Sequence, residues 1–196
     1  MQLNPAQIQA SFEHIPKRAE PMPGYVPAAV LVIFVNLKGG THIVYIRRTR
    51  GLHLHSGHMA FPGGKIDPTD ASSYAAAVRE TCEEIGVAED RYSYLGNLGY
   101  FETLTSRYDA AAHVAWSAQP LEYKPNPFEV AEVVEIPLKS LVQQFRPDLD
   151  SQNPDQVRYL NFRYRSDKTA CEATLWGLTA RVTHHLLAGL AKSHAW

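Results

Sequence analysis

Two apolar stretches near the start of the chain constrain the fold most. Residues 28–35 and 42–46 are rich in β-branched side chains, and Lys38-Gly39-Gly40 lies between them. Such runs on either side of a glycine turn predict a β-hairpin with a buried face. The longer apolar stretch, 26–35, is only about half a membrane span, which also favours a buried strand.

The remaining pattern predicts a mixed α/β domain rather than a doubly wound sheet, because strands and helices do not alternate regularly. A helix is expected at 71–85, where Asp70 or Ser72 can cap the start and Gly86 ends it. A turn is expected at 61–64, since its proline and glycines disfavour a helix. Further strands are expected at 92–101, 111–116, 130–136, 158–164 and 173–176, and further helices within 5–20, at 138–145 and at 177–191.

Length and composition limit the environment and the partners. The 196 residues suit one domain, with residues 1–25 as an N-terminal extension. Lys and Arg number 19 against 20 Asp and Glu, a balance that disfavours a general nucleic-acid binder. Cys82 and Cys171 are the only cysteines, which fits a reducing compartment. With no basic-then-apolar leader pattern, we expect a cytoplasmic protein that binds neither nucleic acid nor membrane, and a homodimer stays open.

The helix expected at 71–85 carries an unusual concentration of carboxylates. Glu80 lies one helical turn from both Glu83 and Glu84, so three carboxylates share one edge near the negative end of the helix dipole. A divalent cation relieves that repulsion, and clustered hard oxygen ligands suit Mg²⁺ or Mn²⁺. The alternative is a solvated acidic face on which Arg79 pairs locally.

The residues around this helix resemble the Nudix box of the Nudix hydrolases. Five residues separate Gly64 from Asp70, and a further eight precede the R-E-T-C-E-E-I-G sequence at 79–86, within a loop–helix–loop at 64–87. The usual box has Glu at the position of Asp70 and seven residues in place of the eight. The coenzyme A branch of the family shares both departures.

Other segments resemble coenzyme A pyrophosphatases. They are Y-I-R-R-T at 45–49, G-H-M-A-F-P-G-G at 57–64, N-P-F-E-V-A-E-V at 126–133 and W-G-L-T-A-R at 176–181. The resemblance runs from about residue 28 to 190. It implies the Nudix fold, an α/β/α sandwich around a mixed β-sheet.

Three features depart from the coenzyme A signature. His53 stands where the signature has an arginine, Thr49 replaces a small Ser or Ala, and residues 105–112 differ from the pattern expected after the box. They concern the substrate preference rather than the hydrolase chemistry.

The resemblance also implies roles for individual residues. Glu80 and Glu84 would bind Mg²⁺ or Mn²⁺ directly, Glu83 would complete the site, and the Gly64 carbonyl would add a ligand. Arg79 would hold Glu83 by a charge-assisted hydrogen bond. Its alternative is an ordinary surface arginine.

The general base is open between a glutamate of the box and one outside it. Glu80 is the candidate within the box, and Glu129 and Glu132 are the candidates outside it, where each could equally be an ordinary loop or strand-edge residue. Asp70 is expected to be a helix cap or a local structural acid rather than a metal ligand.

Basic side chains are concentrated in residues 47–58, between the strand expected at 42–46 and the turn expected at 61–64. Arg48, Arg50 and His53 are the candidates for contacting the phosphates of a substrate. Solvated loop histidines are the alternative for His53, His55 and His58, and the absence of a neighbouring Cys or acid disfavours a transition-metal site there.

Several aromatic side chains could stack on a nucleotide base. Phe61 is the candidate next to the box, with Phe101 and Tyr108 as further options. Aromatics at strand positions more often belong to the core, so core packing is the alternative for all three.

The implied function is divalent-metal-dependent hydrolysis of a pyrophosphate bond in a nucleoside diphosphate derivative. Coenzyme A or acyl-CoA, cleaved to 3′,5′-ADP and (acyl-)4′-phosphopantetheine, is the first substrate hypothesis. ADP-ribose or another nucleotide is the alternative, followed by a Nudix-fold nucleotide sensor without turnover.

Overall fold

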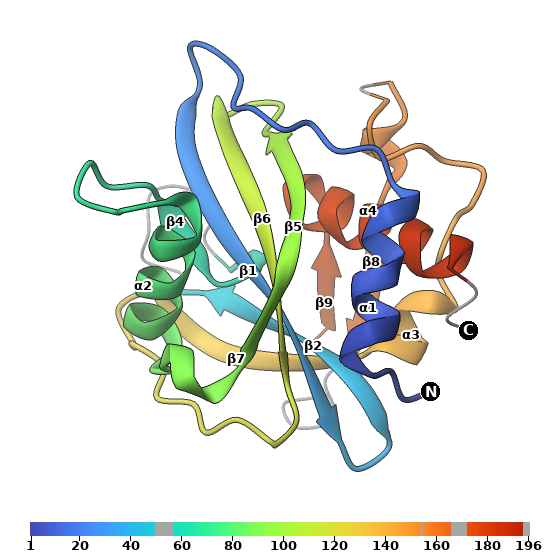
Figure 1. Ribbon diagram of the computed structural model, residues 1–196, viewed down its shortest axis with the longest axis horizontal. Helices are drawn as coiled ribbons and strands as arrows, with labels where there is room; N and C mark the ends of the chain where they lie inside the picture. The colour runs from blue at the N-terminus through green and yellow to red at the C-terminus, as the bar shows by residue number, and fades with distance from the viewer. Residues whose placement is uncertain (50–56, 154, 166–171, 194–196) are drawn as a thin grey trace.

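The computed structural model describes residues 1–49, 57–153, 155–165 and 172–193. Its centre is a seven-stranded mixed sheet with the order β3-β2-β1-β6-β5, in which β4 also pairs with β1 and β7 with β2 (Figure 1). The strands of this sheet are β1 (Val26–Leu37), β2 (Gly40–Arg48), β3 (Met59–Ala60), β4 (Gly63–Lys65), β5 (Ser93–Glu102), β6 (Tyr108–Ser117) and β7 (Val130–Pro137).

The predicted hairpin is confirmed and forms the middle of the sheet. β1 and β2 are antiparallel with Leu37 opposite Gly40, whereas β1 and β6 are parallel with Val26 opposite Tyr108. Because successive side chains of β1 point to opposite faces of the sheet, the strand contributes side chains to two hydrophobic cores. Phe34 belongs to one core and Ile33 to the other.

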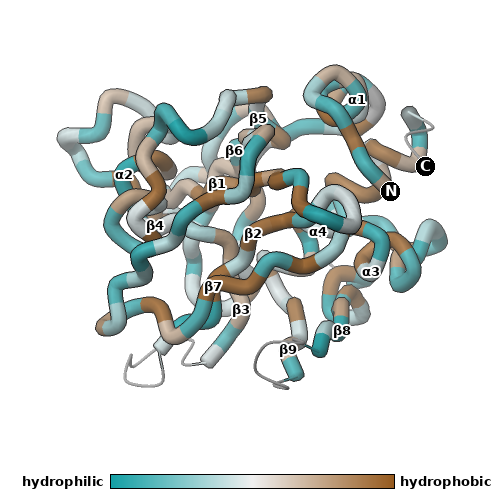
Figure 2. Tube along the Cα trace, turned by 90° about the horizontal axis from the view of Figure 1, so that it is seen from below, coloured by the Kyte–Doolittle hydropathy of each residue, from teal (hydrophilic) through white to brown (hydrophobic). Residues whose placement is uncertain are grey.

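Helices cover both faces of the sheet, as the predicted α/β/α sandwich requires. α2 (Ser73–Ile85) packs Ala76 and Ala77 against the Ile33 face. α1 (Pro5–Ser11) and α4 (Gly177–Lys192) pack Ile8 and Leu186 against the Phe34 face. Figure 2 shows α2 toward one side of the molecule, and α1 and the N-terminus toward the other. The remaining elements are η1 (Phe12–His14), η2 (Glu89–Arg91), α3 (Leu138–Val142), η3 (Val157–Tyr159), β8 (Phe162–Arg165) and β9 (Glu172–Leu175).

Both ends of α2 follow from local sequence. The Ser72 hydroxyl accepts a hydrogen bond from the Ala75 N–H at 3.1 Å, so Ser72 rather than Asp70 is the N-cap. Gly86 ends the helix in the left-handed conformation, φ +69°, and its N–H donates to the Cys82 carbonyl. These caps fix which turn of the helix carries the glutamates.

Long-range pairing changes two of the expected elements. The predicted turn at 61–64 partly becomes a strand, since Gly63 and Gly64 pair with Val30 and Ala29 of β1. The strand expected at 158–164 begins only at Phe162, where β8 pairs with β9, and η3 precedes it. Strand pairing with distant partners, which local patterns do not contain, decided both boundaries.

The helix predicted within residues 5–20 is confirmed, because α1 spans Pro5–Ser11 and η1 continues to His14. α3 is shorter than predicted and ends at Val142 rather than at 145. The extension then crosses to the sheet, where the Arg18 carbonyl accepts from the Tyr100 N–H of β5 at 3.1 Å. It packs on the domain of its own chain. In the described ranges no helix is long and apolar enough to cross a membrane.

Candidate active site

The three glutamates of α2 lie at different depths. Glu84 is almost fully buried, at 1% exposure, and its Oε2 accepts a hydrogen bond from the Gly63 N–H at 2.9 Å. Its other oxygen, Oε1, lies 3.3 Å from Arg48 Nη1. The Glu80 side chain is 17% exposed and that of Glu83 is 57% exposed. The three glutamates therefore range from buried against the sheet to exposed to solvent. The helix that carries them lies beside β4 (Figure 1).

The two glycines of β4 allow this close approach. Gly63 has φ +149°, and a Cβ there would meet the Ala29 carbonyl oxygen at 2.3 Å. A Cβ on Gly64 would lie 2.4 Å from the Glu80 carboxyl carbon. A side chain at position 64 would therefore collide with the Glu80 carboxylate, so the glycine is what lets that carboxylate lie against β4.

Arg79 organises the outer part of the site. Its guanidinium donates to Glu80 Oε1 at 2.9 Å and to Glu83 Oε2 at 3.1 Å, which includes the predicted pairing with Glu83. Its principal partner is Asp70, to which Nε and Nη2 donate at 3.0 Å each. It also donates to the Lys65 carbonyl at 3.1 Å. Asp70 is therefore a structural acid that fixes Arg79, and it is not the helix cap.

Burial and mutual repulsion perturb the acids of this site. Burial raises the pKa of Glu84 to about 7, and the charges of Glu80 and Glu129 add to that rise, although the Gly63 N–H and Arg48 oppose it. Burial likewise raises the pKa of Glu80, with smaller contributions from Glu83 and Glu129, against the opposing effect of Arg79. Counting the described residues alone, the site holds more acidic side chains than arginines.

Glu129 and Glu132, the two candidate bases outside the box, have different surroundings. Glu129 precedes β7 and acts electrostatically on both Glu80 and Glu84, so the fold brings it to the acidic edge. Its Oε1 accepts from Asn126 Nδ2 at 3.1 Å. Glu132 pairs instead with Arg47 Nε at 3.1 Å between β7 and β2. The sequence left Glu129 and Glu132 as equal candidates for the general base, whereas in the structure only Glu129 is placed near the carboxylates of α2.

The predicted phosphate-contacting residues are only partly described. Arg48 ends β2 and reaches Glu84, a contact that the sequence analysis missed because 36 residues separate the two. Arg50 and His53 lie outside the described residues. Phe61 is buried, at 3% exposure, and its ring packs on Tyr45 at 4.8 Å between centroids. A buried ring has no face left for a base, so this structure places Phe61 in the core and corrects the stacking prediction.

The donor set of this site fits a hard divalent cation. Carboxylate oxygens of Glu80, Glu83 and Glu84 and the Gly64 carbonyl are the ligand types that Mg²⁺ and Mn²⁺ prefer. A buried carboxylate with excess negative charge around it is the further observation that favours a cation. Over the described ranges, no three Asp, Glu, His or Cys side chains have the arrangement of a metal site. The carboxylates of α2 form ion pairs with Arg48 and Arg79 instead.

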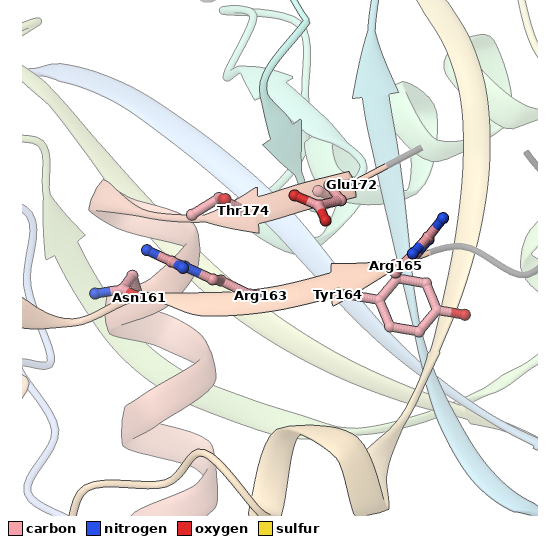
Figure 3. A pocket seen from close by; sticks show the side chains of 7 residues that line it. Asn161, Arg163, Tyr164, Arg165, Glu172 and Thr174 are labelled. Carbon is pink, nitrogen blue, oxygen red and sulfur yellow. The ribbon is translucent and has the colours of Figure 1, made fainter. Parts of the chain in front are cut away.

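A hollow of about 510 Å³ lies elsewhere, on the ribbon of β8 and β9 (Figure 3). Figure 3 shows Arg163 extending toward Asn161, and Arg165 pointing away from it. Its lining residues are Asn161, Arg163, Tyr164, Arg165, Glu172, Ala173 and Thr174. No carboxylate of α2 belongs to it, so it is distinct from the acidic site.

Comparison with known proteins identifies the family. A model of the NUDIX domain matches residues 25–160 of the chain, which include the whole loop–helix–loop described above. The chain therefore belongs to the Nudix family. Relatives that match most of this chain are named Nudix hydrolases.

The sequence relatives are fungal and bacterial. "Probable nudix hydrolase C6G9.05" of Schizosaccharomyces pombe is 31% identical over 160 residues, covering 82% of this chain but 54% of that protein. This chain thus spans about half the length of that relative. "Uncharacterized Nudix hydrolase NudL" of Pectobacterium atrosepticum is 30% identical over 175 residues, covering 88% of this chain and 86% of the relative.

Solved structures share the fold at low sequence identity. A MutT/nudix family protein from Enterococcus faecalis superposes with a TM-score of 0.55 and 15% identity, over 95% of this chain and 74% of that one. The Nudix hydrolase RenU from M. smegmatis gives a TM-score of 0.51 at 21% identity, over 62% and 84% of the two chains. Both support the fold and carry no information on the substrate.

Proposed function

We propose that this protein hydrolyses the pyrophosphate bond of a nucleoside diphosphate derivative with the help of Mg²⁺ or Mn²⁺. Coenzyme A or acyl-CoA is the first substrate choice, with 3′,5′-ADP and (acyl-)4′-phosphopantetheine as products. ADP-ribose or another nucleotide is the alternative.

The buried Glu84 is the observation that carries this proposal. It lies beside Glu80 and Glu129 and receives one N–H from Gly63 and one arginine, Arg48. Burying an incompletely neutralised carboxylate costs free energy, and a structure keeps such a group where a ligand compensates it. A divalent cation that neutralises part of the charge of a pyrophosphate would be a ligand of that kind.

Each residue of the site has a separate task in the proposed reaction. Glu80 and Glu84 would hold the cation directly, with Glu83 and the Gly64 carbonyl completing the set. When bound, the cation would neutralise pyrophosphate charge and lower the pKa of water. Arg79, fixed by Asp70, would keep Glu80 and Glu83 oriented.

Glu129 is our choice for the general base, with Glu80 as the candidate inside the box. Within the described residues, the Glu129 carboxylate accepts its hydrogen bond from the neutral Asn126 side chain, whereas Glu80 is held by Arg79. In the reaction, a water oxygen bonds to one phosphorus while the bond from that phosphorus to the bridging oxygen breaks. The base accepts the proton of the water, and the leaving phosphate keeps the bond electrons.

The phosphate contacts would come from the end of β2 and the residues that follow it. Arg48 lies at the acidic edge, 3.3 Å from Glu84, and Arg50 and His53 follow it in sequence. The substitution of His53 for the signature arginine is the reason to keep ADP-ribose beside coenzyme A as a substrate. The 3′-phosphate of coenzyme A is the group on which the two hypotheses differ.

Product analysis by mass spectrometry separates the hypotheses. The protein is incubated with Mg²⁺ and either coenzyme A or ADP-ribose, with the Glu84→Gln variant as the control for contaminating hydrolases. Release of 3′,5′-ADP and 4′-phosphopantetheine supports the first choice. Cleavage of ADP-ribose alone keeps the mechanism and rejects coenzyme A, whereas no cleavage of a wider nucleotide panel favours the sensor.

The base assignment is tested by two matched variants. Glu129→Gln and Glu132→Gln make the same change three residues apart, but only Glu129 lies at the acidic edge. We expect kcat to fall about a hundredfold or more for Glu129→Gln and to stay within about threefold for Glu132→Gln. Equal rates for both variants would assign the base to Glu80 or to another residue.

A further inference from the structure

Phe128 is the most exposed large apolar side chain in the part of the chain that the structure describes. Its exposed fraction is 83%, against 60% for Tyr159 and 56% for Leu104. A phenyl ring gains nothing from full contact with water, so its exposure is a cost unless something covers it. Single exposed apolar residues are common, and the position of this one therefore has to carry the argument.

The turn that carries Phe128 is tied firmly to the acidic site. The Asn126 N–H donates to the carbonyl of Glu84 at 2.9 Å, and the Asn126 side chain accepts from the Phe128 N–H at 3.1 Å. The carbonyl of Glu129 accepts from the Thr49 N–H at 2.9 Å. Phe128 is thus held between Asn126, which is bonded to the acidic helix, and Glu129, which acts on its carboxylates.

The end of β2 relates this turn to the proposed phosphate-binding residues. The Arg48 N–H donates to the His58 carbonyl on one side of β2, while Thr49 bonds to residues 127 and 129 on the other. Phe128 therefore belongs to a turn that is hydrogen-bonded to Thr49, and Thr49 directly follows Arg48, a group that would meet a phosphate.

We propose that Phe128 is the stacking platform for the aromatic base of the nucleotide substrate. This inference rests on the proposed function, because it assigns the base subsite of the same reaction. The polar turn offers the base a flat apolar face close to the pyrophosphate site. Stacking accepts any base, since every base has a π-face, so the subsite selects for a nucleotide and discriminates weakly between adenine and guanine.

The test compares two probes that differ in whether they carry a base. ADP and inorganic pyrophosphate are titrated into the protein by calorimetry in the presence of Mg²⁺. For Phe128→Ala we expect the Kd of ADP to rise about fivefold to a hundredfold, and the Kd of pyrophosphate to stay within about twofold. Phe128→Trp should restore ADP binding, whereas Phe128→Leu, which keeps apolar bulk without a π-face, should not.

Two control variants locate the effect. Tyr159→Ala removes an exposed ring from η3, which contacts α4 rather than α2, and it should leave both Kd values unchanged. Trp176→Ala removes the half-exposed ring that contacts His58 on the other side of β2. Loss of ADP binding in Trp176→Ala but not in Phe128→Ala would overturn the proposal and move the base to that side.

The outcomes separate this inference from the function on which it rests. Equal weakening of ADP and pyrophosphate by Phe128→Ala, or no weakening of either, overturns the base-stacking role while nucleotide hydrolysis by the wild type remains. A wild-type protein that binds neither probe and cleaves no nucleotide overturns both proposals. Comparable Kd values for ADP and GDP, lost together in Phe128→Ala, are the further result expected from stacking.

Discussion

Two buried charged clusters, one beside α2 and the other beside α4, use the same residue types to opposite effect. Beside α4, Arg18 and Arg181 face Glu102 and Asp109, so two positive charges meet two negative ones. Beside α2, Arg48 and Arg79 face Glu80, Glu83, Glu84 and Asp70, with Glu129 close by. Among the residues that the structure describes, the charges of the first cluster balance and those of the second do not.

The balanced cluster is saturated with hydrogen bonds. Arg181 donates to the carbonyls of Ser151 and Glu102, and its Nη2 lies 3.2 Å from the Glu102 carboxylate. Asp109 accepts from both Nη1 and Nη2 of Arg18 and from the Met22 N–H. Every group has its partner within the protein, so this cluster fastens the N-terminal extension and α4 to the sheet. The unbalanced cluster includes the buried Glu84, whose pKa is raised by burial and by the charges of Glu80 and Glu129, and it is where the proposed chemistry would take place.

Breaking the balanced cluster should have the largest effect, and on stability alone. Arg181→Met keeps most of the volume but leaves Glu102 with one arginine, so we expect a loss of about 3 kcal/mol in the free energy of unfolding. Urea denaturation measures it, and kcat of the folded enzyme should be unchanged. The matched exposed pair is Arg146 with Asp148, at 61% and 57% exposure, where Arg146→Ala should change the free energy of unfolding far less, because solvent screens the two charges.

Neutralising a carboxylate of the unbalanced cluster should lower the catalytic rate and leave the stability of the fold intact. Glu84→Gln should lower kcat about a hundredfold or more, equivalent to about 2.7 kcal/mol in the activation barrier. The metal-free variant should be at least as stable as the wild type, because a repelled buried charge is gone. Steady-state kinetics and thermal melts check the two halves, and a wild-type rate would contradict the role of Glu84.

Acid should weaken the fold through buried neutral histidines. Burial lowers the pKa of His113 to about 4, from about 6.5 in the unfolded chain. The folded state therefore binds fewer protons, and stability is lost as pH falls below 6.5 toward 4. Between pH 7 and pH 5, we expect His113 to contribute a loss of about 2 kcal/mol. Urea denaturation at both pH values measures it.

The control for the acid effect is a residue that does not titrate. In His113→Gln, the loss of stability between pH 7 and pH 5 should shrink by that same amount. His185, whose pKa burial also lowers to about 4, should give a second and separate reduction when replaced by Gln. An unchanged pH slope in both variants would contradict the assignment.

Adding Mg²⁺ should produce the smallest change in stability, and it should act only through the cluster beside α2. At ten times its Kd, a cation that binds the folded state alone adds about 1.4 kcal/mol, or about 3 to 6 °C in Tm. Glu84→Gln should reduce that shift, and Arg181→Met should retain it. An unchanged melting curve for the wild type across millimolar Mg²⁺ would argue against the site.

The difference between the clusters also separates what local patterns predict from what they miss. Spacing alone placed Glu80, Glu83 and Glu84 on one edge of α2, and helix geometry guarantees that result. The pairing of Arg79 with Glu83 is another contact between neighbouring turns, and it is confirmed. Nothing local indicated that Glu84 would be buried or that Arg48 would reach it.

Strand pairing accounts for most of what was missed. β4 runs along β1, which brings the Gly63 N–H to Glu84, and the turn before β7 adds Glu129 beside β2. The same pairing packs Phe61 into the core, although its neighbours in sequence border the site. These contacts join residues that are far apart along the chain, so a periodic pattern does not contain them.

By itself, the sequence determined the central hairpin, the limits of α2 and the spacing of its glutamates, because turns, caps and helical periodicity depend on neighbouring residues. Only the tertiary structure decided which of these carboxylates is buried, which arginine each one meets, and that Phe128 stands exposed beside them. Burial and charge balance depend on which strands pair, and pairing depends on the whole chain.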